Sequence, residues 1–217
     1  MRTDTQNAIS RYRELMINEE TARVLAEYKA WADKLTFDAV SVLPRDELRR
    51  ERSTLFKTII GTMNHSYVVD LIWQAHLEGR AHGFSARNLV LHEELEQLWN
   101  AQQRYNEWLV GWAGGQTEAR LREILRFKFI SGEDGAMSRG AMLLHIVNHA
   151  TYHRGWVSDL LFQIPSKPPT TDFCVFQGMR PDRIADADET IATMRARLPR
   201  RPARRRGPPK RSSSPCG

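Results

Sequence analysis

Residues 143–157 read LLHIVNHATYHRGWV and contain three histidines at intervals of four residues, His145, His149 and His153. Side chains four residues apart lie one above the other on a helix, so two such imidazoles can share one metal ion, as in the HExxH motif. A third histidine from another helix would leave open positions on the ion, as in catalytic metal sites. The spacing alone does not separate the pair His145 and His149 from the pair His149 and His153. It also fits histidines that only pack or form hydrogen bonds on a helix surface.

This stretch belongs to the last of four amphipathic helices that the spacing of apolar residues predicts. The four helices cover residues 21–42, 53–77, 89–112 and 138–162. Ser53 or Thr54 could serve as N-cap of the second helix. Prolines or glycines mark the ends of the four helices: Pro44, Gly79, Gly114 and Pro165. Four apolar stripes bury one another, so the sequence predicts an all-α fold, a four-helix bundle, and bundles build metal sites from facing helices.

A small hairpin insertion is predicted between the third and fourth helices. Residues 123–130, EILRFKFI, are rich in β-branched and aromatic side chains, and SGEDG follows directly. An apolar run of this kind beside a turn with glycine is typical of two short antiparallel strands.

The distribution of charge separates the body of the chain from its C-terminal end. Residues 195–217 contain nine of the 32 Lys and Arg residues and none of the 26 acidic ones, so the remainder has a net charge near −3. We expect an N-terminal extension over residues 1–20 and the bundle over residues 21–180. Residues 181–217 form a C-terminal segment with room for a short helix before a disordered Arg-rich tail. Nucleic-acid binding by this tail is disfavoured, because no aromatic residues are interleaved with its arginines.

The composition also bears on location and on the kind of metal site. No apolar run approaches the roughly 18 to 20 residues of a membrane span, and the N-terminal residues lack the apolar stretch of a secretory signal. A cytoplasmic location is therefore predicted. The two cysteines, Cys174 and Cys216, form no CxxC motif, and no disulfide is expected. Any metal site must use His, Asp or Glu.

Four motifs, in order along residues 21–178, resemble those of the DinB family. They are YKAWADKL at residues 28–35, TMNHSYVVDLIW at 62–73, the histidine stretch at 143–157 and PPTTDFCVFQ at 168–177. The resemblance implies an up-down-down-up four-helix bundle that holds one divalent metal ion. It implies His65, His149 and His153 as the ligands, because Arg-Gly follows the last ligand in the family. Zinc or nickel is the expected ion, since imidazole suits both.

One position departs from the family's pattern. Family members often have Gln after Arg-Gly, whereas this chain has Trp156. Trp156, three residues beyond His153, and Arg154 are candidate cofactor-binding residues, Arg154 through an anionic group of the bound molecule. A structural ion pair for Arg154 is an equal alternative, and Trp156 and Trp73 suit a core or interface position better than a substrate platform.

The remaining polar residues near the motifs are expected to support the site. His145 is interpreted as a hydrogen-bonded neighbour of the ligands or as a core histidine. Asn148 and Asp70 are candidate partners for the second nitrogen of a ligand imidazole. Asp70 is five residues from His65, which turns it about 140° away on a helix, so an ion pair near a helix junction suits it better. Three histidines are expected at the surface: His76, His82 and His92.

The resemblance implies metal-dependent chemistry on a small-molecule substrate. Relatives of the family include thiol-dependent S-transferases and a thiol-dependent isomerase, so activation of a low-molecular-weight thiol is the first hypothesis. A metal-dependent hydrolase that activates water is the second. A non-catalytic, damage-inducible or stress-response metal-binding protein is the alternative, because many family members have no assigned reaction. The resemblance also implies a homodimer.

Overall fold

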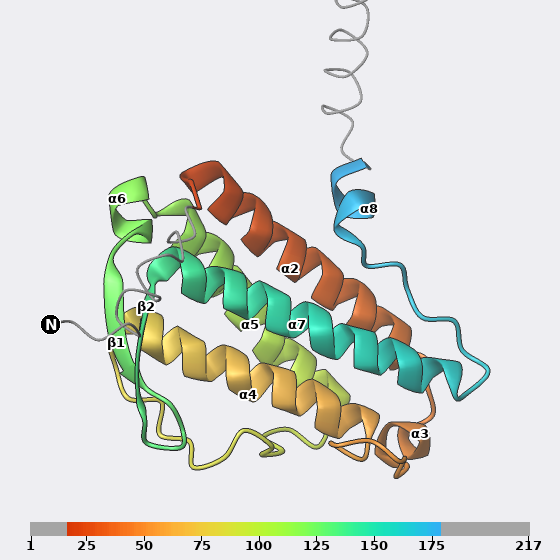
Figure 1. Cartoon of the computed structure of the whole chain (residues 1–217). Helices are drawn as coiled ribbons and strands as arrows, with labels where there is room; N and C mark the ends of the chain where they lie inside the picture. The colour runs from red at the N-terminus through yellow and green to blue at the C-terminus, as the bar shows by residue number, and fades with distance from the viewer. Residues whose placement is uncertain (1–16, 179–217) are drawn as a thin grey trace, which may run out of the picture. The chain divides into compact units, whose positions relative to one another are not determined.

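The computed structural model describes residues 17–178 and is mostly helical (Figure 1). Four helices have 20 or more residues: α2 (Glu19–Ser41), α4 (Ile59–Glu78), α5 (Leu95–Gly114) and α7 (Arg139–Phe162). Three are short: α3 (Arg45–Arg49), α6 (Glu118–Leu121) and α8 (Phe173–Gly178). None of the helices in this part of the chain has the length and apolar character that a membrane span requires.

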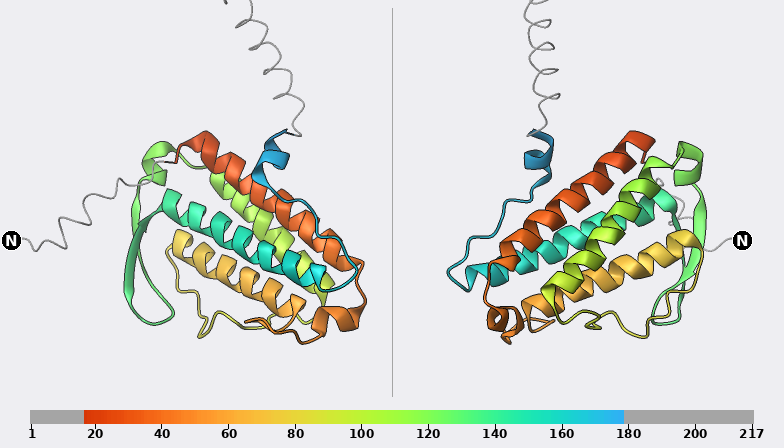
Figure 2. Two further views of the ribbon diagram at one scale, coloured as in Figure 1. Left: turned by 45° about the vertical axis from the view of Figure 1, so that its right-hand side comes forward. Right: turned by 180° about the vertical axis from the view of Figure 1, so that it is seen from behind.

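The four long helices pack side by side, and each contacts two of the others (Figures 1 and 2). Helix α2 packs on α5 and α7, and α4 packs on the same two helices. Their contact faces bury leucines completely, among them Leu98, Leu109, Leu143 and Leu161. Each such side chain stabilises the fold by about 1.5–3 kcal/mol. The pairing of α4 with α7 matters for function, because it brings histidines of both predicted metal motifs together.

Helix α4 begins later than the sequence predicts. It starts at Ile59, and Thr58 is its N-cap, accepting a hydrogen bond of 2.9 Å from the backbone N–H of Gly61. The predicted caps Ser53 and Thr54 are therefore wrong. Residues 52–58 form a tight turn in which Lys57 has a φ of 62°, a conformation that apolar spacing cannot reveal. The predicted end is confirmed, because Gly79 caps the helix with a φ of 71°.

The third long helix also begins later than predicted, at Leu95 instead of residue 89. Asn64, on α4, is the physical reason. Its side-chain amide donates to the carbonyl of His92, and its carbonyl oxygen accepts from the backbone N–H groups of Leu91 and His92. These hydrogen bonds take the place of helical ones and hold residues 91–92 in a loop beside α4.

The predicted hairpin is confirmed. Strand β1 (Ile124–Lys128) pairs antiparallel with β2 (Asp134–Ser138), and Phe127 faces Gly135 across the pair. The buried Phe127 ring packs on Trp73 of α4 with centroids 5.1 Å apart. Ser138 ends the hairpin and caps α7 by accepting from the backbone N–H of Ala141. The hairpin therefore lies against α4 near the start of α7.

The segment after α7 returns to α2. The Tyr28 hydroxyl of α2 donates to the Thr171 carbonyl at 2.9 Å. The rings of Phe173 and Phe176 pack on Tyr28, and Phe176 also contacts Trp31. Most of the predicted N-terminal extension, the short helix expected after residue 181 and the Arg-rich tail lie outside the described residues.

Candidate metal centre

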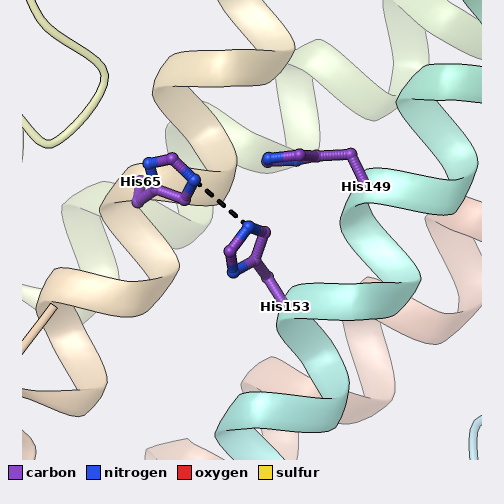
Figure 3. Close-up of side chains that lie close together, drawn as sticks. All are labelled: His65, His149 and His153. Carbon is purple, nitrogen blue, oxygen red and sulfur yellow. Dashed lines mark hydrogen bonds between the residues drawn. The ribbon is translucent and has the colours of Figure 1, made fainter. Parts of the chain in front are cut away.

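Three histidine side chains converge between α4 and α7 (Figure 3). His65 comes from α4, and His149 and His153 come from successive turns of α7. One nitrogen of each ring lies within 4.8 Å of the other two, and the Nε2 atoms of His65 and His153 are 3.1 Å apart. Within residues 17–178, this is the group of His, Cys, Asp and Glu side chains that is compact enough to hold a metal ion.

The three imidazoles are neutral at physiological pH. Burial and the neighbouring rings of His153 and His65 lower the pKa of His149 to about 2. Burial and the ring of His65 lower the pKa of His153 to about 4. Metal ions bind the neutral form of imidazole, so these rings need lose no proton before they bind one.

The ring nitrogens also leave bonding capacity unused. The Nδ1 atoms of His149 and His153 are buried and have no hydrogen-bond partner among the described residues. An unpaired buried polar atom costs about 1–3 kcal/mol. Three neutral imidazoles, two of them with an unpaired nitrogen, form a donor set that suits zinc, nickel, copper or iron. The residues present therefore fit a divalent ion.

The second nitrogen of His65 is held by the backbone of the loop between α4 and α5. Its Nδ1 lies 2.8 Å from the carbonyl of Arg87, so donation from this nitrogen turns the lone pair of Nε2 toward the cluster. Burial lowers the pKa of His65, the bond to Arg87 partly offsets this, and the Arg87 guanidinium lowers the pKa further. Neither candidate partner bonds His65: Asp70 binds Lys29, in line with the ion pair that suited it better, and Asn148 is exposed.

Aromatic side chains close one side of the cluster. The Phe56 ring stacks on His65, with centroids 4.0 Å apart and planes inclined by 18°. Trp156 packs on both Phe56 and His153, at centroid distances of 5.7 and 5.2 Å. Trp156, which stands where family members often have Gln, is thus part of an apolar wall beside the histidines.

A cavity of about 510 Å³ opens on another side of the cluster. His149 and His145 line it from α7, Trp73 lines it from α4, and the turn of the hairpin completes it. The His145 ring packs on Trp73 with centroids 4.5 Å apart and lies outside the ligand group, as predicted for a neighbour. A larger cavity of about 620 Å³ lies between the end of α2 and the start of α5, away from these histidines.

A buried ion network lies in the interior beside α7. Lys29 has no exposed surface and donates to Asp33 and Asp70, each at 2.7 Å. Arg154, the residue after His153, donates to Asp33 at 2.9 Å. Of the two alternatives for Arg154, the structure has the ion pair. Asp70 was expected to pair near a helix junction but instead pairs in the middle of α4, because the apolar stripe of α2 carries Lys29 inward.

Burial and the neighbouring charges shift the pKa values of the groups in this network in opposite senses. Burial acts to lower the pKa of Lys29, but the carboxylates of Asp33 and Asp70 outweigh it and raise that pKa. Burial acts to raise the pKa of Asp33, but Lys29 and Arg154 outweigh it and lower that pKa. Asp70 has one cationic partner, and burial raises its pKa to about 6.

The other histidines lie outside the cluster. His76 is buried against Phe127 and Trp73, so its predicted surface position is wrong; the hairpin covers it. His82 and His92 are half-buried.

A mostly helical fold in which two helices bring three imidazoles together defines a class of candidate metal proteins. Residues 16–187 match the model of the DinB family, and the chain belongs to that family. Protein DinB of Bacillus subtilis (strain 168) is 26% identical over 164 residues, which cover 71% of this chain and 92% of that protein. The crystal structure of a DinB-like protein from Bacillus cereus ATCC 10987 is 19% identical, with a TM-score of 0.49, and the match covers 66% of this chain and 91% of that one.

Proposed function

We propose that this chain is a divalent-metal-dependent enzyme of thiol S-transferase type, in which His65, His149 and His153 hold the ion. The observation that supports this most is the cluster itself, three ring nitrogens within 4.8 Å beside a cavity of about 510 Å³. The ion would supply Lewis acidity, which lowers the pKa of a small thiol or water molecule at an open position. Zinc or nickel is the proposed ion.

The chain's own residues orient the ligand histidines, admit the substrate and exclude water from the site. The Arg87 carbonyl fixes the tautomer of His65, and Phe56 and Trp156 shield the ligands from solvent on one side. The cavity on the side of His149 gives a small electrophile access to the centre. Arg154 and Asp33 tie α7 to α2 directly beside His153, which favours a fixed ligand position.

A metal-dependent hydrolase is the second candidate. His145 supports it, because this imidazole lines the cavity next to His149. Burial lowers the pKa of His145, so the ring is neutral and able to accept a proton from water. Activity of the zinc-loaded protein with small thiols and a chloronitrobenzene would favour the transferase, and release of nitrophenol from an ester without thiol would favour the hydrolase.

We also propose that the four long helices run up, down, down and up. The connection from α4 to α5 covers residues 79–94 and, when extended, reaches beyond the roughly 30 Å length of a 20-residue helix. This connection is therefore long enough to return along the bundle and join two helices that run parallel to each other. The homodimer, the cytoplasmic location and the domain limits at residues 20 and 180 stay predictions.

Elemental analysis of protein purified without affinity tag or chelator tests the metal site. Wild type is expected to contain about one equivalent of a divalent metal, and His65→Ala and His149→Ala are expected to contain none while keeping their helical circular dichroism. His92→Ala is the matched control, because His92 lies outside the cluster and holds Asn64 through backbone atoms only. A wild-type protein that takes up neither zinc nor nickel contradicts the proposal.

A further inference from the structure

The cavity beside His149 has walls of two kinds. Its apolar part comes from α4 and from the hairpin turn: Val69, Ile72, Trp73, Phe129 and Ile130. Its charged residues are Arg87 on the loop after α4 and Glu133 on the hairpin turn. A volume of about 510 Å³ lies in the usual range for a small-molecule site. The walls thus suit a molecule with an apolar body and a polar or charged end.

Arg87 is the cation of this cavity that is not engaged elsewhere. Its backbone carbonyl is bonded to His65, which fixes the position of the residue relative to the cluster. Its side chain forms no ion pair or hydrogen bond within residues 17–178, and its guanidinium is close enough to act electrostatically on His65. Arg154, by contrast, is buried and committed to Asp33.

The charges around the cavity favour an anion. Arg87 and Glu133 balance each other, and the imidazoles are neutral. A divalent ion on the three histidines would therefore leave the cavity with a net positive charge. A guanidinium binds a carboxylate through two parallel hydrogen bonds, which gives orientation as well as affinity.

We propose that the substrate bound in this cavity is a small carboxylate with an aromatic or branched apolar body, and that Arg87 binds its carboxylate. This inference rests on the proposed function for the metal that completes the positive charge. Arg87 thus takes the anion-binding role that was one of two equal alternatives for Arg154. The apolar body lies between α4 and the hairpin turn, with its reactive part toward His149.

Isothermal titration calorimetry with three probes of one shape tests the proposal: 3-phenylpropanoate, 3-phenylpropanamide and 3-phenylpropylamine. The anionic probe is expected to bind most tightly, and acetate, which lacks the apolar body, more weakly than 3-phenylpropanoate. Arg87→Gln should weaken binding of the anion by about ten- to a hundredfold and leave binding of the amide unchanged. Arg126→Gln is the matched control, because it removes the same charge from the exposed face of β1, outside this cavity.

Each titration is run on zinc-loaded and on metal-free protein, with zinc content measured separately. Preference for the anion that depends on Arg87 in both states supports the inference. Equal affinities for the three probes, equal effects of the two arginine variants, or no binding of 3-phenylpropanoate at millimolar concentration overturns it, whatever the zinc content. If the protein does not take up zinc but still binds the anion through Arg87, the metal-dependent function is overturned and this inference is not.

Discussion

Lys29 places a full positive charge in the interior of the protein, where its ammonium group touches two carboxylates and the side chain of Asn106. Such a charge is tolerated only while it is paired, because desolvation costs several kcal/mol per ion. The network contains two cations and two carboxylates, so removal of one member leaves the interior with an uncompensated charge.

We therefore predict that Lys29→Met destabilises the protein by about 3–5 kcal/mol. Methionine fills a similar volume, so the loss of stability comes mainly from the unpaired carboxylates and not from a cavity. The control is Lys34→Met, which breaks an exposed pair with Asp38 and should cost less than about 1 kcal/mol. Urea denaturation measures both, and equal losses in the two variants would show that the buried network adds no stability.

At the scale of single residues, the sequence predicted which histidines come together better than it predicted their surroundings. Helical spacing left the pairs His145/His149 and His149/His153 open, and the resemblance to the DinB family selected His149 and His153. The same resemblance selected His65 through the motif around it. The partners of these residues depend on contacts between distant parts of the chain: Arg87 is 22 positions from His65, and Asp70 is 41 from Lys29. The spacing of Lys29 and Asp33 on the apolar stripe of α2 was the one local signal of a buried ion pair.

At the scale of elements, the first turn of α4 fixes the aromatic wall of the metal site. Gly61 lies beneath the carbonyl of Phe56, and a Cβ at Gly61 would be 2.5 Å from that oxygen and 2.9 Å from Oγ1 of Thr58. Real Cβ atoms do not approach backbone oxygens so closely. A side chain at this position must therefore displace the turn that carries Phe56 onto His65.

Gly61→Ala is accordingly expected to destabilise the protein by about 1–3 kcal/mol and to weaken its affinity for zinc. Intrinsic helix propensity predicts the opposite sign, since Ala is favoured over Gly by about 0.5–1 kcal/mol inside a helix. Gly111→Ala on α5 provides the comparison, because a Cβ at this position would meet nothing within 4 Å. This substitution should therefore stabilise the protein. Urea denaturation midpoints measure the stability of the two variants, and zinc titrations measure their affinity for zinc. If both substitutions stabilise the protein, the turn that carries Phe56 can move at little cost in free energy.

The four long helices and the hairpin were predictable because their signals are local. Apolar residues at intervals of three and four, and glycines such as Gly79 and Gly114, mark the helices and their ends. The starts of α4 and α5 were predicted six residues too early. Tertiary interactions set them: the tight turn before Thr58 and the hydrogen bonds of Asn64 to the loop.

At the scale of the whole molecule, acid is expected to unfold the metal-free protein. Burial lowers the pKa of five histidines in the fold: His65, His76, His145, His149 and His153. In the unfolded chain the pKa of each of these histidines returns to about 6.5. Below that pH the unfolded state therefore binds more protons than the folded state, and stability is lost as pH falls. Asp70 acts oppositely, because its folded pKa of about 6 exceeds the unfolded value, but it is one group against five.

The urea midpoint in the presence of a chelator should therefore be lower near pH 5 than near pH 7. His149→Gln should show a smaller drop, since it removes the histidine whose pKa changes most on folding. A midpoint that is equal or higher near pH 5 would mean that these histidines remain accessible to protons in the folded state.

Metal binding should have the largest effect on the stability of the whole molecule, because the ligands come from two helices that the ion would join. A ligand that binds only the folded state stabilises it by about 4 kcal/mol at a thousandfold excess over its Kd. For a domain of this size, that corresponds to a rise in Tm of roughly 8–16 °C. Wild type and His92→Ala should show this rise with zinc, and His65→Ala and His149→Ala should not. Calorimetry that finds the same rise in all four proteins would place the zinc elsewhere, on groups other than the α4–α7 histidines.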